Sequence, residues 1–84
     1  MKWGLQIGNR AKRQLRRLSG AEREVVDEVF TELCNDPFQG DIKVLRGLGS
    51  LRRRVGDWRI MFDLDHANRV IKVTSVERRG STTY

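Results

Sequence analysis

The stretch 51–62, LRRRVGDWRIMF, constrains the fold most, because Gly56-Asp57 separates two runs of alternating character. Glycine adopts positive φ without steric penalty, so this pair suits a tight type II′ turn. We therefore expect an antiparallel β-hairpin. Pairing outward from the turn sets the following residues opposite one another: Val55 and Trp58, Arg54 and Arg59, Arg53 and Ile60, Arg52 and Met61, Leu51 and Phe62.

Side chains on a strand alternate between two faces, so this hairpin separates apolar from basic residues. The apolar, core-side face is predicted to carry Leu51, Val55, Trp58, Ile60 and Phe62, and Arg53 falls on the same parity. The other face carries Arg52, Arg54 and Arg59. Guanidinium groups on one small patch repel each other, which favours an anionic partner such as phosphate. The alternative is a solvated basic surface without a ligand.

The composition supports a nucleic-acid partner. The 84 residues carry a net charge of +6 and are expected to form a single domain, residues 1–84. Among the basic residues, thirteen arginines outnumber four lysines, and arginine binds phosphate bidentately and stacks on bases. No apolar run has the length of a membrane-spanning helix and no signal-peptide pattern follows Met1, so we expect a cytoplasmic protein without a membrane partner.

The first half of the chain predicts one strand and two helices. Apolar and polar residues alternate over residues 2–7, as in a half-buried strand. A short, very basic helix follows, with Asn9 as its expected N-cap. A second helix is predicted to begin at a capping box formed by Ser19 and Glu22 and to end before Pro37. Its apolar stripe comprises Val25, Val26, Val29, Phe30, Leu33 and Cys34.

The second half predicts strands: residues 42–45, the central hairpin through residue 64, and residues 70–76 after a turn over 65–68. Apolar residues in the last strand occupy both parities, which indicates either a central strand covered on both faces or a β-bulge. The order β-α-α-β-β-β predicts an α+β fold, with an N-terminal strand and a helical hairpin laid on one face of a mainly antiparallel sheet. The arginine face stays open.

Several kinds of chemistry find no support in the residues. The chain has one histidine, His66, in a predicted turn, so a two-histidine ribonuclease mechanism is not available. Its one cysteine, Cys34, cannot form an internal disulfide and reads as a small core residue. No metal-ligand pattern and no glycine-rich phosphate loop occur, so no cofactor and no metal site are predicted.

Three segments carry a resemblance to a known family: KVLRG, LRRRVGDWRIMFDLD and VIKVTSVERRGSTTY. With the order of elements, they resemble the RelE/ParE superfamily of bacterial toxin-antitoxin toxins over essentially the whole chain, and the RelE-like branch is favoured. RelE-like toxins cut messenger RNA in the ribosomal A site with basic sheet residues, two further arginines and a tyrosine near the C-terminus. By position these are Arg52 and Arg54, then Arg59, Arg79 and Tyr84. Arg52 and Arg54 stand where such toxins commonly have lysines, and the spacing from Arg79 to Tyr84 is offset by one residue.

The resemblance implies metal-free cleavage, in which a 2′-hydroxyl attacks the adjacent phosphorus. Arg59 is then the best candidate to stabilise charge on the phosphorane, with Arg79 second. Tyr84 is expected to stack on a base or to transfer a proton. Arg52, Arg54 and Arg78 are the predicted phosphate-binding residues. Glu77 is expected either to act as a general base or, more simply, to pair with its neighbours Arg78 or Arg79.

Three functions therefore stay open. The first is a ribosome-dependent endoribonuclease, whose partners are messenger RNA, the ribosome and a cognate antitoxin. The second is a ParE-like inhibitor of DNA gyrase, because that branch shares the fold and much of the hairpin pattern. The third is a non-catalytic basic module that binds nucleic acid or an antitoxin.

Overall fold

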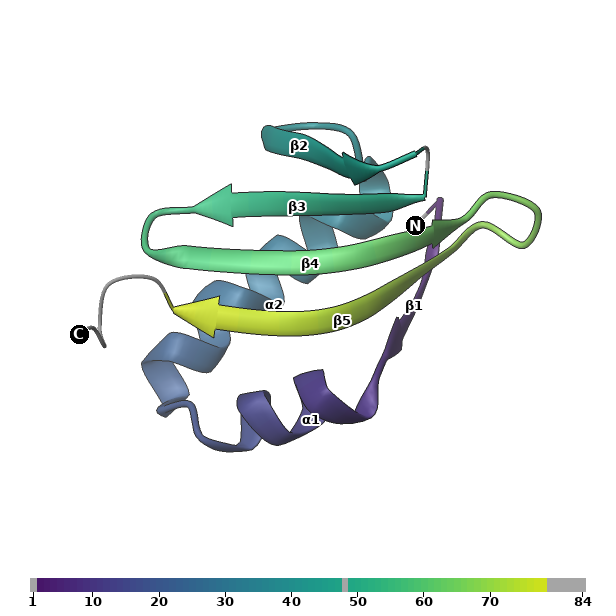
Figure 1. The fold of residues 1–84 in the computed structure, drawn as a ribbon. Coiled ribbons are helices and arrows are strands. Elements are labelled where there is room, and N and C mark those ends of the chain that lie inside the picture. The colour runs from purple at the N-terminus through teal and green to yellow at the C-terminus, as the bar shows by residue number, and fades with distance from the viewer. Residues whose placement is uncertain (1, 48, 79–84) are drawn as a thin grey trace.

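The computed structural model describes residues 2–47 and 49–78, which form one five-stranded sheet with two helices (Figure 1). In chain order the elements are β1 (Gly4–Ile7), α1 (Asn9–Arg16), α2 (Gly20–Asn35), β2 (Asp41–Arg46), β3 (Ser50–Val55), β4 (Trp58–Asp65) and β5 (Val70–Arg78). The strand order is β1-β5-β4-β3-β2. Among the described strands only β1 pairs parallel, with β5, so the predicted α+β fold with a mainly antiparallel sheet is confirmed. Within the described residues, neither helix is long and apolar enough to cross a membrane.

The central hairpin has the predicted register. Val55 pairs with Trp58, and the ladder continues through Arg54 and Arg59 to Leu51 and Phe62. Gly56 has a φ of 55°, whereas Asp57 is not in the left-handed region. Positive φ at the first central residue alone is the pattern of a type II′ turn, which matches the right-handed twist of the two strands.

The first helix begins at Asn9, but its N-cap is Gly8, and no side chain caps it. The prediction of Asn9 as the N-cap was wrong. The parallel pairing of β1 with β5 extends one residue further, because the Gly8 amide donates a hydrogen bond to the Val73 carbonyl at 2.9 Å. A Cβ atom at Gly8 would lie 3.2 Å from that carbonyl oxygen. The strand pairing therefore decides where the chain turns into α1.

The second helix confirms the predicted capping box. The Ser19 hydroxyl accepts a hydrogen bond from the Glu22 amide at 3.2 Å, and the Glu22 carboxylate accepts one from the Ser19 amide at 2.9 Å. The helix ends at Asn35, as the following Asp36-Pro37 predicts. One member of the predicted apolar stripe was misplaced: Val25 is exposed, whereas the other members are buried against the sheet.

A β-bulge explains the mixed parity of the last strand. Phe62 pairs with Val73 and Met61 pairs with Ser75, so Thr74 is an extra residue in β5. Val73 faces the core before the bulge and Val76 faces it afterwards. Of the two sequence interpretations, the bulge is the one that accounts for the pattern.

The core lies between the helices and one face of the sheet, where α2 crosses behind β3 and β4 in Figure 1. Its strand residues include Leu51, Trp58, Ile60 and Phe62, as predicted. Val55, also predicted there, packs against this core but is only partly buried. Arg53 shares this side and is also buried: it pairs with Glu32 of α2 and donates a hydrogen bond to the Gln39 carbonyl at 3.0 Å. It therefore ties β3 to the end of α2.

Replacing Trp58 with alanine should lower the free energy of unfolding by about 3 to 5 kcal/mol, because Trp58 is only 8% exposed and its loss leaves a cavity in the core. Urea unfolding followed by circular dichroism measures this change. The exposed Val25 on α2 provides the control, since Val25→Ala should leave the midpoint nearly unchanged. Equal midpoints for both variants would contradict the assigned core.

The capping box should make stability depend on pH. The Ser19 amide lowers the pKa of Glu22 below its ordinary value of 4.5, against an opposing effect of burial and with smaller contributions from the Ser19 hydroxyl and Arg78. A carboxylate with a lowered folded-state pKa stabilises the protein above its unfolded pKa, and that stabilisation disappears as the pH falls through the folded value. The stability difference between the wild type and Glu22→Gln should thus be full at neutral pH and shrink as the pH falls below 4.5. Urea unfolding of both proteins across this range tests it, and a difference that does not change with pH would contradict it.

Candidate functional site

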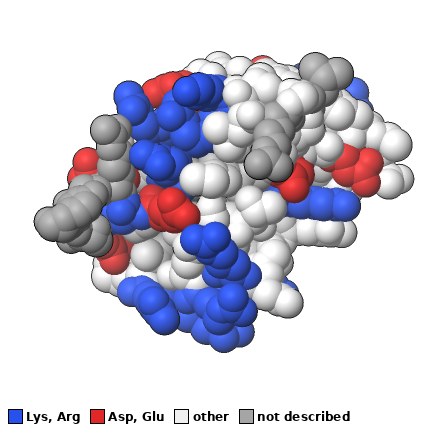
Figure 2. Space-filling model, in the orientation of Figure 1, with Lys and Arg blue, Asp and Glu red and all other residues white. Residues whose placement is uncertain are grey.

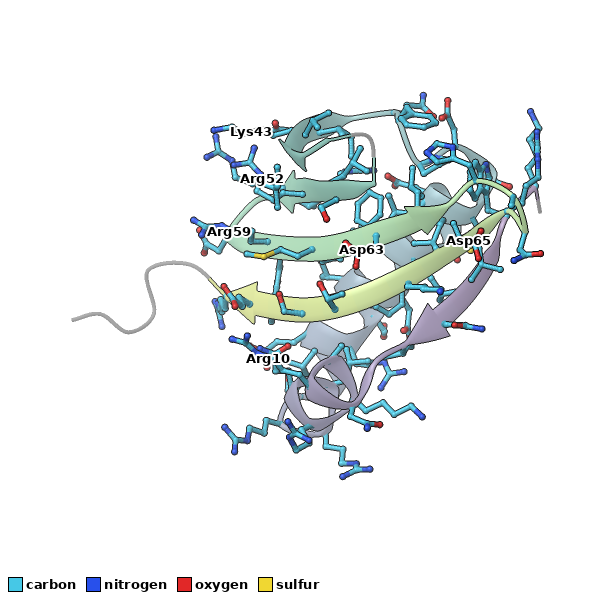
Figure 3. The ribbon with its side chains drawn as sticks, turned by 45° about the vertical axis from the view of Figure 1, so that its right-hand side comes forward. Arg10, Lys43, Arg52, Arg59, Asp63 and Asp65 are labelled. Atoms are coloured by element: carbon cyan, nitrogen blue, oxygen red, sulfur yellow. The ribbon has the colours of Figure 1, made fainter. Side chains whose placement is uncertain are left out.

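The sheet face opposite the helices gathers basic side chains from three neighbouring strands. Arg54 lies opposite Arg59 across the β3–β4 pair, and Lys43 of β2 lies opposite Arg52 of β3. Because paired residues share a face, all four point to the open side of the sheet. Figure 2 shows Lys and Arg side chains concentrated over this part of the sheet, and in Figure 3 Lys43, Arg52 and Arg59 lie toward the hairpin end of the strands. We call Lys43, Arg52, Arg54 and Arg59 the basic face.

Two carboxylates flank the basic face. On β2, Asp41 has one oxygen 3.5 Å from Arg52 and the other 3.3 Å from Arg54. On β5, Glu77 lies directly opposite Arg59 but pairs with Arg10 of α1 at 3.2 Å. Asp41 therefore offsets part of the repulsion at one side of the cluster. Such partly exposed ion pairs contribute little stability, so they leave these guanidiniums able to exchange partners.

Arg59 occupies the middle of this arrangement, between Arg54 on β3 and Glu77 on β5. Among the residues that the structure describes, it has no ion pair and no side-chain hydrogen bond. Its Nε–H is buried and has no acceptor in the described part of the chain, and the same holds for the Nε–H of Arg52. Buried donors usually have partners in folded proteins, and an unpaired one calls for a physical reason. Because Arg59 has no carboxylate partner among the described residues, its guanidinium is the one on this face that is most available to an external anion.

A hollow of about 230 Å³ lies on the same face, beyond Met61. Leu45 and Met61 give it apolar walls, and Asp63, which accepts a hydrogen bond from the Ser50 hydroxyl at 2.8 Å, gives it a polar one. Met61 pairs with Arg52, so the hollow adjoins the basic face. The hollow thus has both apolar and polar walls and lies next to the guanidiniums of the basic face.

The structure brings together three of the six predicted site residues: Arg52, Arg54 and Arg59. It places Arg78 on the helix side, where Arg78 pairs with Glu22 at 2.7 Å and its guanidinium lies 5.8 Å from the centre of the Trp58 ring. Arg78 there lines a groove of about 450 Å³ together with Leu18 of the α1–α2 connection. The remaining two predicted site residues, Arg79 and Tyr84, together with Met1 and Leu48, lie outside the described residues. Arg78, which was predicted to bind phosphate together with Arg52 and Arg54, therefore lies on a different surface from the basic face.

Sequence reasoning missed two members of the site region, Lys43 and Arg10. Alternation along β2 was a usable signal for Lys43, but the register of β2 against β3 was not known. Among the described residues, Glu77 pairs not with its neighbour Arg78 but with Arg10, 67 positions earlier in the chain; Arg79, the other expected partner, lies outside the described residues. That pair depends on the packing of α1 against β5, which no local pattern reveals.

The other chemically notable residues lie elsewhere. His66 is in the β4–β5 turn with its ring centre 6.0 Å from that of Trp3, which confirms the turn assignment. Cys34 is buried in the core, and burial raises the pKa of its thiol, which confirms its interpretation as a core residue. Among residues 2–47 and 49–78, no three His, Cys, Asp or Glu side chains are grouped so as to hold a metal ion.

Comparison with known proteins supports the fold through solved structures. No protein-family model matches the sequence, and no curated protein matches it. The archaeal RelE-RelB complex from Pyrococcus horikoshii OT3 contains a chain 25% identical, with a TM-score of 0.82 over 98% of this chain and 100% of that one. The toxin-antitoxin complex RelBE2 from Mycobacterium tuberculosis matches at 23% identity and a TM-score of 0.82, over 94% of this chain and 100% of that one. Isolated E. coli RelE matches at 18% identity and 0.81, over 95% of this chain and 87% of that one. The fold is therefore the RelE fold along nearly its whole length.

The basic face predicts that binding of single-stranded RNA weakens steeply with salt. Four cations that neutralise phosphates give a slope of log K against log salt of about −3, since each contact contributes about −0.7. Lys43→Ala should reduce this slope by about 0.7, whereas Arg23→Ala, on α2, should leave it unchanged. Fluorescence anisotropy with a labelled, 2′-O-methylated RNA octamer measures the slope. An affinity that does not vary with salt would exclude phosphate recognition by this surface.

Proposed function

We propose that this chain, which has the RelE fold, is a RelE-like toxin of the RelE/ParE superfamily that cuts translated messenger RNA on the ribosome. The observation that carries the proposal is Arg59, a guanidinium without a protein partner among the described residues, at the centre of the basic face. Solved RelE structures with the same fold support the assignment as a toxin of a toxin-antitoxin pair.

In the proposed reaction, the 2′-hydroxyl of one nucleotide attacks the adjacent phosphorus. The bond from phosphorus to the 5′-oxygen breaks, which leaves a cyclic phosphate on one fragment and a 5′-hydroxyl on the other. Negative charge grows on the phosphorane oxygens, and preorganised cations stabilise it. Arg59 is the proposed ligand of that phosphate, and Arg52, Arg54 and Lys43 are the proposed ligands of its neighbours.

The basic face supplies cations for the phosphate but no strong general acid or base for proton transfer. Arginine stays protonated, so Arg52 and Arg54 supply charge but no base. Tyr84 is the proposed proton-transfer residue and Arg79 the proposed second phosphate ligand. Binding on the ribosome would hold the RNA for in-line attack, and this orientation compensates for weak acids and bases. Free RNA should accordingly be a poor substrate.

The proposed partners follow from the surface and from the neighbouring structures. Several of the matched structures are complexes of RelE with RelB, which supports a protein antitoxin as the partner of this chain. The net charge of +6 favours an antitoxin segment that is acidic, and covering the basic face would block access of RNA. The proposed place of action is the cytoplasm, where translated messages are found.

One experiment separates this function from inhibition of gyrase. Induction of the chain in bacteria is followed by measurement of protein synthesis, DNA synthesis and primer-extension maps of translated messages. Early loss of protein synthesis with new cuts inside translated regions supports the proposal. Damage to DNA with intact messages would overturn it in favour of the gyrase interpretation.

Arg59→Ala should lower single-turnover cleavage on programmed ribosomes by about 10²- to 10³-fold, by analogy with removal of one donor to a developing oxyanion. Ribosome binding should fall much less, because the other cations of the basic face remain. The melting temperature should change little, since the Arg59 side chain makes no hydrogen bond or ion pair with the described residues.

Arg23→Ala, on α2, is the matched control for this experiment and should retain full cleavage. Arg53→Ala is less suitable, because Arg53 is buried and paired with Glu32, so its loss should destabilise the protein. Full activity in a folded Arg59→Ala protein would remove Arg59 from the mechanism.

A further inference from the structure

One carboxylate in the site region, that of Glu77, has an arginine opposite it on the neighbouring strand and a second arginine as its ion-pair partner. Glu77 of β5 lies directly opposite Arg59 of β4, and paired residues on adjacent strands present their side chains side by side on one face. Opposite charges in this arrangement attract each other. Yet the Glu77 carboxylate pairs with Arg10 of α1, at 3.2 Å through one oxygen, and not with Arg59. Figure 3 shows Arg10 and Arg59 on the two sides of β5 at the hairpin end of the sheet.

Whether Arg59 has an ion-pair partner depends on which arginine Glu77 pairs with. With Arg10 in place, Glu77 is occupied and Arg59 has no ion pair among the described residues. Without Arg10, the nearest guanidinium across the strand pair is that of Arg59. A Glu77–Arg59 pair would neutralise the cation at the centre of the basic face and compete with any anion for the same donors.

We propose that Arg10 is a positioning residue: by holding the Glu77 carboxylate, it keeps Arg59 available for an RNA phosphate. The inference rests on the proposed function, because it assumes that Arg59 binds phosphate. The packing of α1 against β5 carries Arg10 to this place, so the helix acts on the site through a single ion pair.

The proposal differs from a general electrostatic effect in a measurable way. If Arg10 merely adds positive charge, then removing Arg10 and neutralising Glu77 change RNA affinity independently, and their effects multiply. If Arg10 restrains Glu77, then Glu77 is harmful only when Arg10 is absent. A double-mutant cycle separates these cases, because it isolates the coupling between two neighbouring residues.

The cycle compares wild type, Arg10→Ala, Glu77→Gln and the double variant. The probe is a fluorescein-labelled, 2′-O-methylated RNA octamer, and its affinity is measured by anisotropy at one fixed ionic strength. Arg13→Ala, an exposed residue of the same helix, controls for the loss of one positive charge from α1. Arg10→Lys keeps a cation beside Glu77 and tests for rescue. Melting curves confirm that each variant is folded.

We expect Arg10→Ala to weaken binding by about fivefold, the upper range for an exposed ion pair, and Arg13→Ala to weaken it by less than about twofold. Glu77→Gln should recover most of the loss in the Arg10→Ala background, yet change affinity by less than about twofold on its own. Arg10→Lys should bind nearly as tightly as the wild type. The chemical shift of the Arg59 Nε–H proton reports on the partner of Arg59. It should be similar in the wild type and the double variant, and different in Arg10→Ala.

Two different failures are distinguishable. If Glu77→Gln raises affinity by the same factor with and without Arg10, the restraint is absent and this inference is overturned, while the phosphate site stands. If Arg59→Ala leaves the affinity for the octamer unchanged, Arg59 does not bind phosphate, and the proposed function loses its main support together with the inference.

Discussion

The pairing of β3 with β4 is the constraint on which the rest of the structure depends. One register, set by the Gly56-Asp57 turn, places Trp58, Ile60 and Phe62 against the helices and Arg52, Arg54 and Arg59 on the open face. A slip of one residue would exchange these faces and bury the guanidiniums. The same ladder that builds the core therefore builds the basic face.

The open face carries more positive charge than its own acidic residues neutralise. Asp41 contacts Arg52 and Arg54 at one side, and Glu77 contacts Arg10 at the other. Arg59 lies between these two carboxylates and has no ion pair with any described residue. The apolar core and the Arg53–Glu32 pair lie on the helix side, away from this face. A repulsive cluster is tolerable on such a sheet, and an anionic ligand would relieve the repulsion.

Features that depend on near neighbours in the chain could be predicted from the sequence. The hairpin register and the Ser19–Glu22 capping box are of this kind, since turn chemistry and short spacing determine them. Features that depend on contacts between distant segments could not be predicted from the sequence. The N-cap moved to Gly8 because β1 pairs with β5, and Val25 stayed exposed because the angle at which α2 lies on the sheet is a tertiary property. For the same reason the site's three hairpin arginines were predicted together, whereas Lys43 and the Arg10–Glu77 pair were not.

The end of β5 connects both sides of the protein through two adjacent residues. Glu77 reaches Arg10 of α1 beside the basic face, whereas Arg78 reaches Glu22 at the start of α2 and covers the Trp58 ring. Alternation along one strand thus links each helix to this strand end by one ion pair. The Arg10–Glu77 pair thereby joins α1 to the edge of the basic face, and the Arg78–Glu22 pair joins α2 to the opposite side of the same strand end.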